Sequence, residues 1–177
     1  MRNFENFSDM EFDVMREIGN IGAGNAATAL AGILGDKILI SVPKLQIIDV
    51  SNITSLLGGP ENLVAGLLVN MEQDVKGMLL YILDKEFVSG ILETLLGETV
   101  NELTDVSDIG RSALMEISNI LSGSYIQALS SFTGLDIRLS TPQSAIDMVG
   151  AILNYPAAQF GEMGDKLLLI EENFITS

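Results

Sequence analysis

The sequence predicts an α/β protein built from two related halves. The segment Glu17–Pro43 recurs 99 residues later as Glu116–Pro142, and 11 of 27 positions are identical without a gap. Each copy joins a long helical pattern to an extended segment, and two apolar runs with a hairpin pattern follow the first copy. At 177 residues, we expect a single domain made of two pseudo-repeats, at about 8–97 and 105–177.

The first predicted helix begins after Ser8 and ends near Gly35. Ser8 and Glu11 have the spacing of a capping box, and glycine is the preferred residue just past a helix end. Four glycines lie inside this pattern, and glycine lowers helix propensity. We therefore expect close packing around this helix to compensate for them.

Strands are expected after the first long helix. Lys37–Val50 has the Ile and Val content of two extended segments around Pro43, and the stretch 51–60 predicts a short helix or a loop. Leu63–Met71 and Val75–Leu83 are apolar runs separated by three polar residues, which indicates a hairpin.

A short amphipathic helix closes the first half. Asp84 suits its N-cap and Gly97 its C-terminal stop. The acidic stretch Glu98–Asp108 is expected to connect the two halves and is predicted to be a solvated loop. The inner side of the short helix is predicted to hold Phe87, Ile91, Leu92, Leu95 and Leu96.

The second half is expected to repeat this order. A long helix is predicted from about Asp108 to Thr133, followed by a strand through Leu139. Ala145–Leu153 is extended or helical and precedes Tyr155-Pro156, and Lys166–Ile175 is the last predicted strand. By analogy with the first half a hairpin partner should follow, so we expect a second half that is shorter or truncated.

Composition excludes several classes of chemistry. The chain has no His and no Cys, which removes imidazole catalysis, thiol nucleophiles and His or Cys metal sites. We therefore expect that the protein binds no metal ion of its own. A net charge of −15 argues against nucleic acid and anionic membranes and favours a partner with a basic patch.

The location expected from the sequence is the cytoplasm. The N-terminal stretch 1–12 is polar and acidic, unlike a signal peptide. Ile18–Gly35 carries no charge over 18 residues, but it contains Asn, Thr and five Gly. That composition favours a packed helix over a membrane span, so we expect no membrane insertion. The absence of Cys is consistent with a cytoplasmic protein.

Two helix stripes carry the candidate catalytic residues. Positions i, i+4 and i+7 share one face of a helix. A carboxylate there can pair with a cation, and a carboxamide can both donate to and accept from a water molecule. One such stripe is most simply a solvated face, whereas its repetition at the same offset favours function. The stripes are Asp13, Glu17 and Asn20, and Ser112, Glu116 and Asn119.

Part of the helix that carries the first stripe also matches a dinucleotide-binding motif. Gly22, Gly24 and Ala27 fit the pattern G-x-G-x-x-A. That motif requires a preceding strand and a helix that begins at the glycines, whereas these glycines lie inside the helical pattern. Nucleotide binding is therefore disfavoured.

The complete spacing resembles the CheC/CheX/FliY family of chemotaxis phosphatases. Its signature is Asp or Ser, then Glu four residues on, Asn three further on, and Pro after another 22 residues. Two copies in one short chain are most similar to CheC-type members, and the segment GNIGAGNAATAL strengthens the likeness. The matching residues are Asp13, Glu17, Asn20 and Pro43, and Ser112, Glu116, Asn119 and Pro142.

This resemblance implies a fold and an activity. The fold is a pseudo-twofold α/β domain in which two long helices pack on a mostly antiparallel sheet, with their Glu/Asn faces exposed. The activity is hydrolysis of the aspartyl phosphate on the response regulator CheY, which supplies the Mg²⁺. Asn20 and Asn119 would orient water, Glu17 and Glu116 would pair with the regulator's Lys, and the remaining four signature residues would support the motif.

The resemblance also implies a second partner, the receptor deamidase CheD. A CheD-binding surface is predicted near 146–152, with Asp147, Met148 and Ile152 as its residues, although a plain core segment fits equally well. Two alternatives to the enzyme stay open: a regulatory binding module for CheD, and a FliY-like flagellar-switch phosphatase. We expect a monomer.

Overall fold

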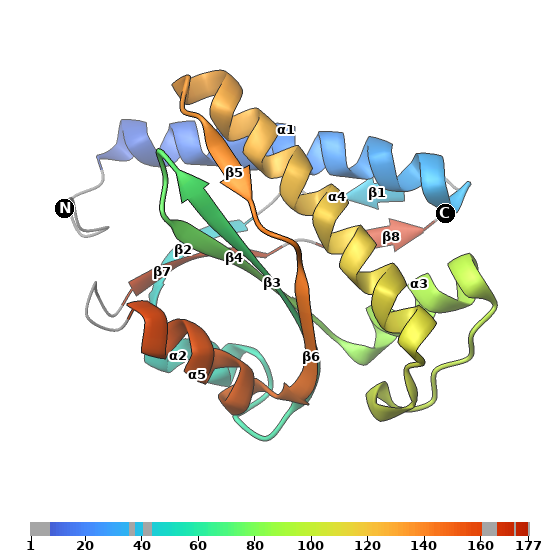
Figure 1. Ribbon diagram of the computed structural model, residues 1–177. Coiled ribbons are helices and arrows are strands. Elements are labelled where there is room, and N and C mark those ends of the chain that lie inside the picture. The colour runs from blue at the N-terminus through green and yellow to red at the C-terminus, as the bar shows by residue number, and fades with distance from the viewer. Residues whose placement is uncertain (1–7, 36–37, 41–43, 161–165, 172, 177) are drawn as a thin grey trace.

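The computed structural model describes residues 8–35, 38–40, 44–160, 166–171 and 173–176. Figure 1 shows an arrangement of layers, with the strands between two sets of helices. The long helices α1 (Asp9–Leu34) and α4 (Asp108–Thr133) lie on one side, and α2 (Val50–Leu56) and α5 (Val149–Phe160) lie on the other. This confirms the α/β class and the long helices packed on antiparallel strands.

The repeat is visible in the boundaries of the elements. Helices α1 and α4 are both 26 residues long and begin 99 residues apart. The same offset relates β1 (Ile38–Ile40) to β5 (Ile137–Leu139), and β2 (Lys44–Asp49) to β6 (Gln143–Met148). Because both halves build the same elements at the same spacing, the sequence repeat is also a structural repeat.

The last predicted strand is in fact two strands. The long strand β3 (Leu63–Gln73) pairs antiparallel with β6 along its first part and with β5 at its end. Its counterpart in the second half is divided into β7 (Lys166–Glu171), which pairs with β2, and β8 (Phe174–Thr176), which pairs with β1. Each half therefore completes the sheet of the other.

The first hairpin is confirmed, with β3 paired antiparallel to β4 (Gly77–Leu83). Within the described residues, the second half has no counterpart of β4. The segment predicted as Ala145–Leu153 divides at Val149, where β6 gives way to α5, and α5 continues through Pro156 rather than ending before it.

The predicted helix caps are confirmed. The Ser8 hydroxyl accepts from the Glu11 amide at 3.3 Å, and the Glu11 carboxylate accepts from the Ser8 amide at 2.8 Å. Gly35 ends α1 in the left-handed conformation at φ 70°. Helix α3 (Lys85–Leu96) begins at Asp84, whose carboxylate accepts from the Phe87 amide at 2.8 Å.

The predicted inner face of α3 needs one correction. Leu96 is exposed, because it lies in the last turn and points away from the core. Val88, which the prediction left out, is fully buried beside Ile91 and Leu92. The helix is therefore rotated toward Val88 relative to the face expected from its sequence.

The acidic join is more than a solvated loop. It contains the 3₁₀ helix η2 (Leu103–Asp105), and its apolar residues Val100, Leu103 and Val106 are buried in the main core. The Glu98 carboxylate accepts from the Ser107 amide at 2.9 Å and from the Ser107 hydroxyl at 2.7 Å. These bonds lower the pKa of Glu98 and fix the residue that caps α4.

Strand β3 is covered on both faces, which explains its nearly continuous apolar run. Ala65 and Leu67 belong to the core under α1, α3 and α4, whereas Val64 belongs to a second core with α2 and α5. On that second side, a Cβ placed at Gly66 would lie 2.8 Å from a methyl carbon of Ile152. The alternation follows the two-residue period of a strand.

The two long helices cross each other (Figure 1), and Gly22 of α1 lies in close contact with Tyr125 of α4. A Cβ placed at Gly22 would lie 2.6 Å from a carbon of the Tyr125 ring. The positions that correspond to Tyr125 and Gly22 in the opposite halves are Ala26 and Leu121, both buried in the same core. In both of these equivalent pairs, the small residue lies on α1 and the large residue lies on α4.

We predict that Gly22→Ala lowers the free energy of unfolding by about 1–3 kcal/mol, because the added methyl overlaps the Tyr125 ring. The control is Gly24→Ala on the same helix, where the methyl meets nothing within 4 Å. That control should gain about 1 kcal/mol from helix propensity. Thermal and urea unfolding measure the free energy of unfolding of both variants. A Gly22→Ala protein as stable as the Gly24→Ala protein would contradict the close crossing.

Candidate functional site

The four predicted catalytic side chains lie on the two long helices and face outward. Glu17, Glu116 and Asn119 are exposed, and Asn20 is half-buried rather than exposed as expected. Among the described residues, no hydrogen bond or ion pair engages the side chains of Glu17, Glu116 or Asn119. These polar groups are therefore available to a partner.

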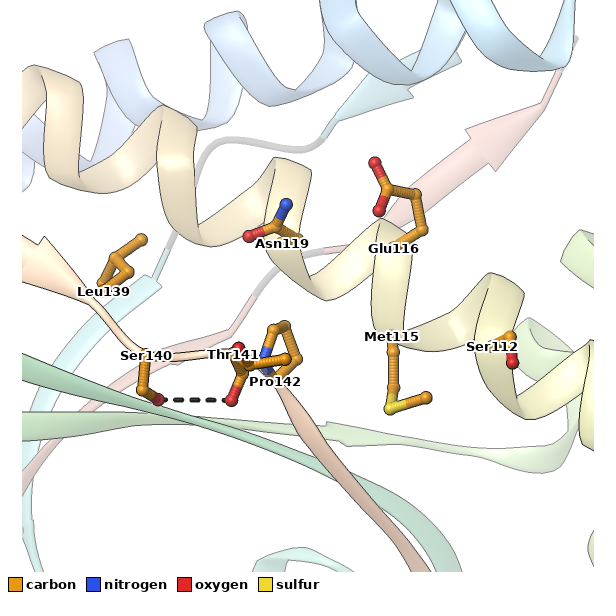
Figure 2. Close-up of a pocket in the computed structure, with 8 residues that line it drawn as sticks. All are labelled: Ser112, Met115, Glu116, Asn119, Leu139, Ser140, Thr141 and Pro142. Atoms are coloured by element: carbon orange, nitrogen blue, oxygen red, sulfur yellow. Dashed lines mark hydrogen bonds between the residues drawn. The ribbon is translucent and has the colours of Figure 1, made fainter.

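The second stripe borders a pocket of about 360 Å³. Figure 2 shows the Glu116 and Asn119 side chains extending from neighbouring turns of α4, with the segment after β5 running beside them. Helix α4 and this segment together line the pocket, and Asn119 lies at its edge on α4. The lining residues are Ser112, Met115, Glu116, Asn119, Leu139, Ser140, Thr141 and Pro142.

Ser140 fixes the far wall of this pocket. Its amide donates to the Asn70 carbonyl at 2.9 Å, and its hydroxyl accepts from the Asn70 amide at 2.9 Å. The hydroxyl also lies 3.2 Å from the Thr141 carbonyl, as the dashed line in Figure 2 marks. Because Ser140 is bonded to β3, it holds Thr141 and the half-buried Pro142 against α4.

Ser140 is a site residue that the catalytic prediction left out. The signal was present, because Ser41 and Ser140 are identical at equivalent positions of the repeat, each two residues before a proline. Its role could not be recognised from sequence, since its partner Asn70 is 70 residues away on another strand. Pro43 and Ser41 lie outside the described residues, so the matching wall of the first stripe is not described.

Two of the motif-supporting residues, Asp13 and Ser112, bond within their own helices. The Arg16 guanidinium pairs with the Asp13 carboxylate at 2.9 Å, and both side chains are more than half exposed. The Ser112 hydroxyl donates to the Asp108 carbonyl at 3.0 Å. Arg16 corresponds to Met115 in the repeat, so the first stripe carries a cation where the second carries an apolar pocket residue.

The structure excludes the dinucleotide motif. Gly22 and Gly24 lie in the middle of α1, where amides are bonded within the helix and no phosphate can reach them. No group of three or more acidic side chains suited to a metal occurs in the part of the chain that is described. Of the helices described there, none is long and apolar enough to span a membrane.

The residues predicted to bind CheD do not form one surface. Asp147 and Met148 are exposed at the end of β6, and the Asp147 carboxylate accepts from the Met148 amide at 2.7 Å. Ile152 is 9% exposed and packs in the second core against Gly66, so its place in a partner surface is wrong. Because α5 begins at Val149, Ile152 lies one turn further along the same helix face as the buried Val149 and therefore points into the core.

Comparison with known proteins identifies the family. The chain is 31% identical over 176 residues to the Bacillus subtilis protein named CheY-P phosphatase CheC, covering 97% of this chain and 83% of that one. The chain belongs to the CheC-like family. The family's model matches residues 10–47 and again 109–146, so each half of this CheC-like chain carries the family pattern.

Other relatives of this CheC-like protein include flagellar proteins. Bacillus subtilis FliY, named a flagellar motor switch phosphatase, is 30% identical over 78% of this chain, which spans 36% of FliY. The crystal structure of Thermotoga maritima FliY superposes with a TM-score of 0.77 at 28% identity, covering 97% of this chain and 86% of the other. The fold described above is thus the fold of this family.

Proposed function

We propose that this chain is a phosphatase that hydrolyses the aspartyl phosphate of the response regulator CheY, with one catalytic Glu/Asn pair on each long helix. The observation that carries the proposal is the repetition of outward-facing Glu and Asn at the same helical register. The names of its Bacillus subtilis relatives, CheY-P phosphatase and flagellar motor switch phosphatase, support it.

Asn119 is suited to position the attacking water. Its carboxamide oxygen can accept a hydrogen bond from the water while its amide group donates elsewhere, which fixes the orientation of the water. The water oxygen attacks phosphorus, the bond from phosphorus to the aspartyl oxygen breaks, and the water's proton leaves with inorganic phosphate. An acyl phosphate is already activated, so positioning supplies most of what catalysis needs.

Glu116 serves recognition rather than proton transfer. It lies one turn from Asn119, where its carboxylate can pair with the regulator's active-site Lys and set the register of the Asn119 side chain. The Mg²⁺ belongs to CheY in this scheme, so the chain needs neither His nor Cys. Glu17 and Asn20 act in the same way on α1. The cytoplasmic location and the monomeric state remain predictions.

The wall behind Asn119 contributes preorganisation. Ser140 is bonded to β3 through two hydrogen bonds to Asn70, so Pro142 keeps its place when a partner docks. A wall that is already fixed in the free chain does not have to be ordered when the partner binds, which lowers the entropic cost of assembling the site.

We predict that Asn20→Ala and Asn119→Ala each disable one site and leave the other active. The double variant should lose about 30- to 1000-fold in the rate of phosphate release, the usual effect of removing a group that orients the reacting atoms. Replacing Asn by Asp should lower the rate of phosphate release as much as replacing it by Ala, because the negative charge of Asp repels the phosphoryl group. Phosphate release from phosphorylated CheY in Mg²⁺ measures this.

The matched control is Asn25→Ala, which removes an exposed asparagine from α1 away from the stripe. It should retain full activity. Circular dichroism should show that all these variants are folded. If the double variant is folded and as active as the Asn25→Ala control, Asn20 and Asn119 have no part in the reaction.

We also propose that CheD binds at the end of β6, where Asp147 and Met148 are both exposed outside the catalytic stripes. An exposed apolar residue beside an acidic one suits a partner with a basic rim. Asp147→Lys should weaken CheD binding by about tenfold, the cost of a repelling charge at an interface, and leave phosphate release unchanged. Asp136→Lys, at another exposed acidic position, is the control, and equal CheD affinity in both variants contradicts this surface.

A further inference from the structure

Each catalytic stripe continues by one more turn toward the start of its helix, and an exposed apolar residue lies there. Met10 is 75% exposed and Ile109 is 69% exposed, the two highest values among the large apolar side chains that the structure describes. The two positions are 99 residues apart and therefore equivalent in the repeat. The catalytic stripes thus share an apolar end as well as Glu and Asn.

The helix geometry brings these residues into the reach of one partner surface. Met10 precedes Asp13, Glu17 and Asn20 by three, seven and ten residues, spacings that share one helix face. Along the axis, Ile109 lies about 10 Å from Glu116 and about 15 Å from Asn119. A domain that covers the Glu/Asn pair would also cover the apolar residue, because protein interfaces extend about 800 Å² on each partner.

Exposed apolar residues are common on protein surfaces, and equivalence in the repeat does not by itself single these two out. Leu56 and Tyr155 are also equivalent and exposed, at 61% and 45%. They lie on α2 and α5, across the strands from the stripes (Figure 1). Met10 and Ile109 differ because they are continuous with the polar groups of the site.

We infer that Met10 and Ile109 are apolar anchors that dock each stripe onto the phosphorylated regulator. This inference rests on the proposed function. The occupant is the regulator itself, since Met10 and Ile109 lie on the same helix faces as the Glu and Asn residues that the proposed function assigns to it. A few well-packed side chains commonly carry most of the binding free energy of an interface. The anchors govern affinity for the regulator and do not touch the reacting atoms.

The test uses a chain with a single working site. In an Asn20→Ala background, which leaves the second site, Ile109→Ser should raise the KM for phosphorylated CheY about tenfold and leave kcat unchanged. Ile109→Met, which copies the residue of the first stripe, should restore the KM. Leu56→Ser is the control, because it removes an equally apolar and exposed side chain outside both stripes.

Binding of CheY loaded with beryllofluoride gives a second readout that does not depend on turnover. Affinity should fall about tenfold for Ile109→Ser and stay constant for Leu56→Ser. If the Asn20→Ala protein is active and Ile109→Ser keeps its KM, the anchor is refuted while the phosphatase stands. If that protein does not accelerate phosphate release at all, the proposed function fails and the anchor with it.

Two further results would overturn the inference. A fall in kcat at constant KM would mean that Ile109 acts on the chemistry or on the shape of α4. A wild-type chain that sediments as a dimer, and an Ile109→Ser chain that sediments as a monomer, would assign the apolar ends to contacts between copies.

Discussion

The close crossing of α1 and α4 is the constraint on which the rest of the structure depends. Gly22 admits the Tyr125 ring, and the equivalent pair Ala26 and Leu121 lies in the same core. Because the inward faces of both helices are committed to this contact and to the strands, their outward faces carry Glu and Asn. Among the glycines of α1, Gly22 is required by this close approach, whereas a Cβ at Gly24 or Gly32 would meet nothing within 4 Å.

A site of this kind divides the chemistry between two proteins. The chain offers a carboxylate, a carboxamide and a fixed wall, whereas the proposed partner brings the activated phosphoryl bond and the metal. That division suits a protein without His or Cys, whose strong negative charge favours a partner with basic groups. Within the described part of the chain, the side chains of Glu17, Glu116 and Asn119 make no hydrogen bond or ion pair, as suits a site completed by a partner.

Local signals in the sequence predicted the helices well. The Ser8–Glu11 capping box and Gly35 act within a few residues, so the limits of α1 follow from them. The two stripes were predicted as well, because their residues are only three or four positions apart on one helix. Tertiary packing decided the rest: β7 and β8 pair with strands over 100 residues away, and Ile152 is buried because Gly66 leaves room for it. Ser140 was missed because its partner Asn70 lies on a distant strand.

The central claim is that water, positioned by this chain, takes the phosphoryl group directly from the regulator. Following a radiolabelled phosphoryl group from CheY during a single turnover tests it most directly. The label should pass to inorganic phosphate faster than in CheY alone and should never appear on this chain. Label bound covalently to the chain, for example at Ser112 or Glu116 beside Asn119, would contradict the account and indicate a phosphorylated intermediate.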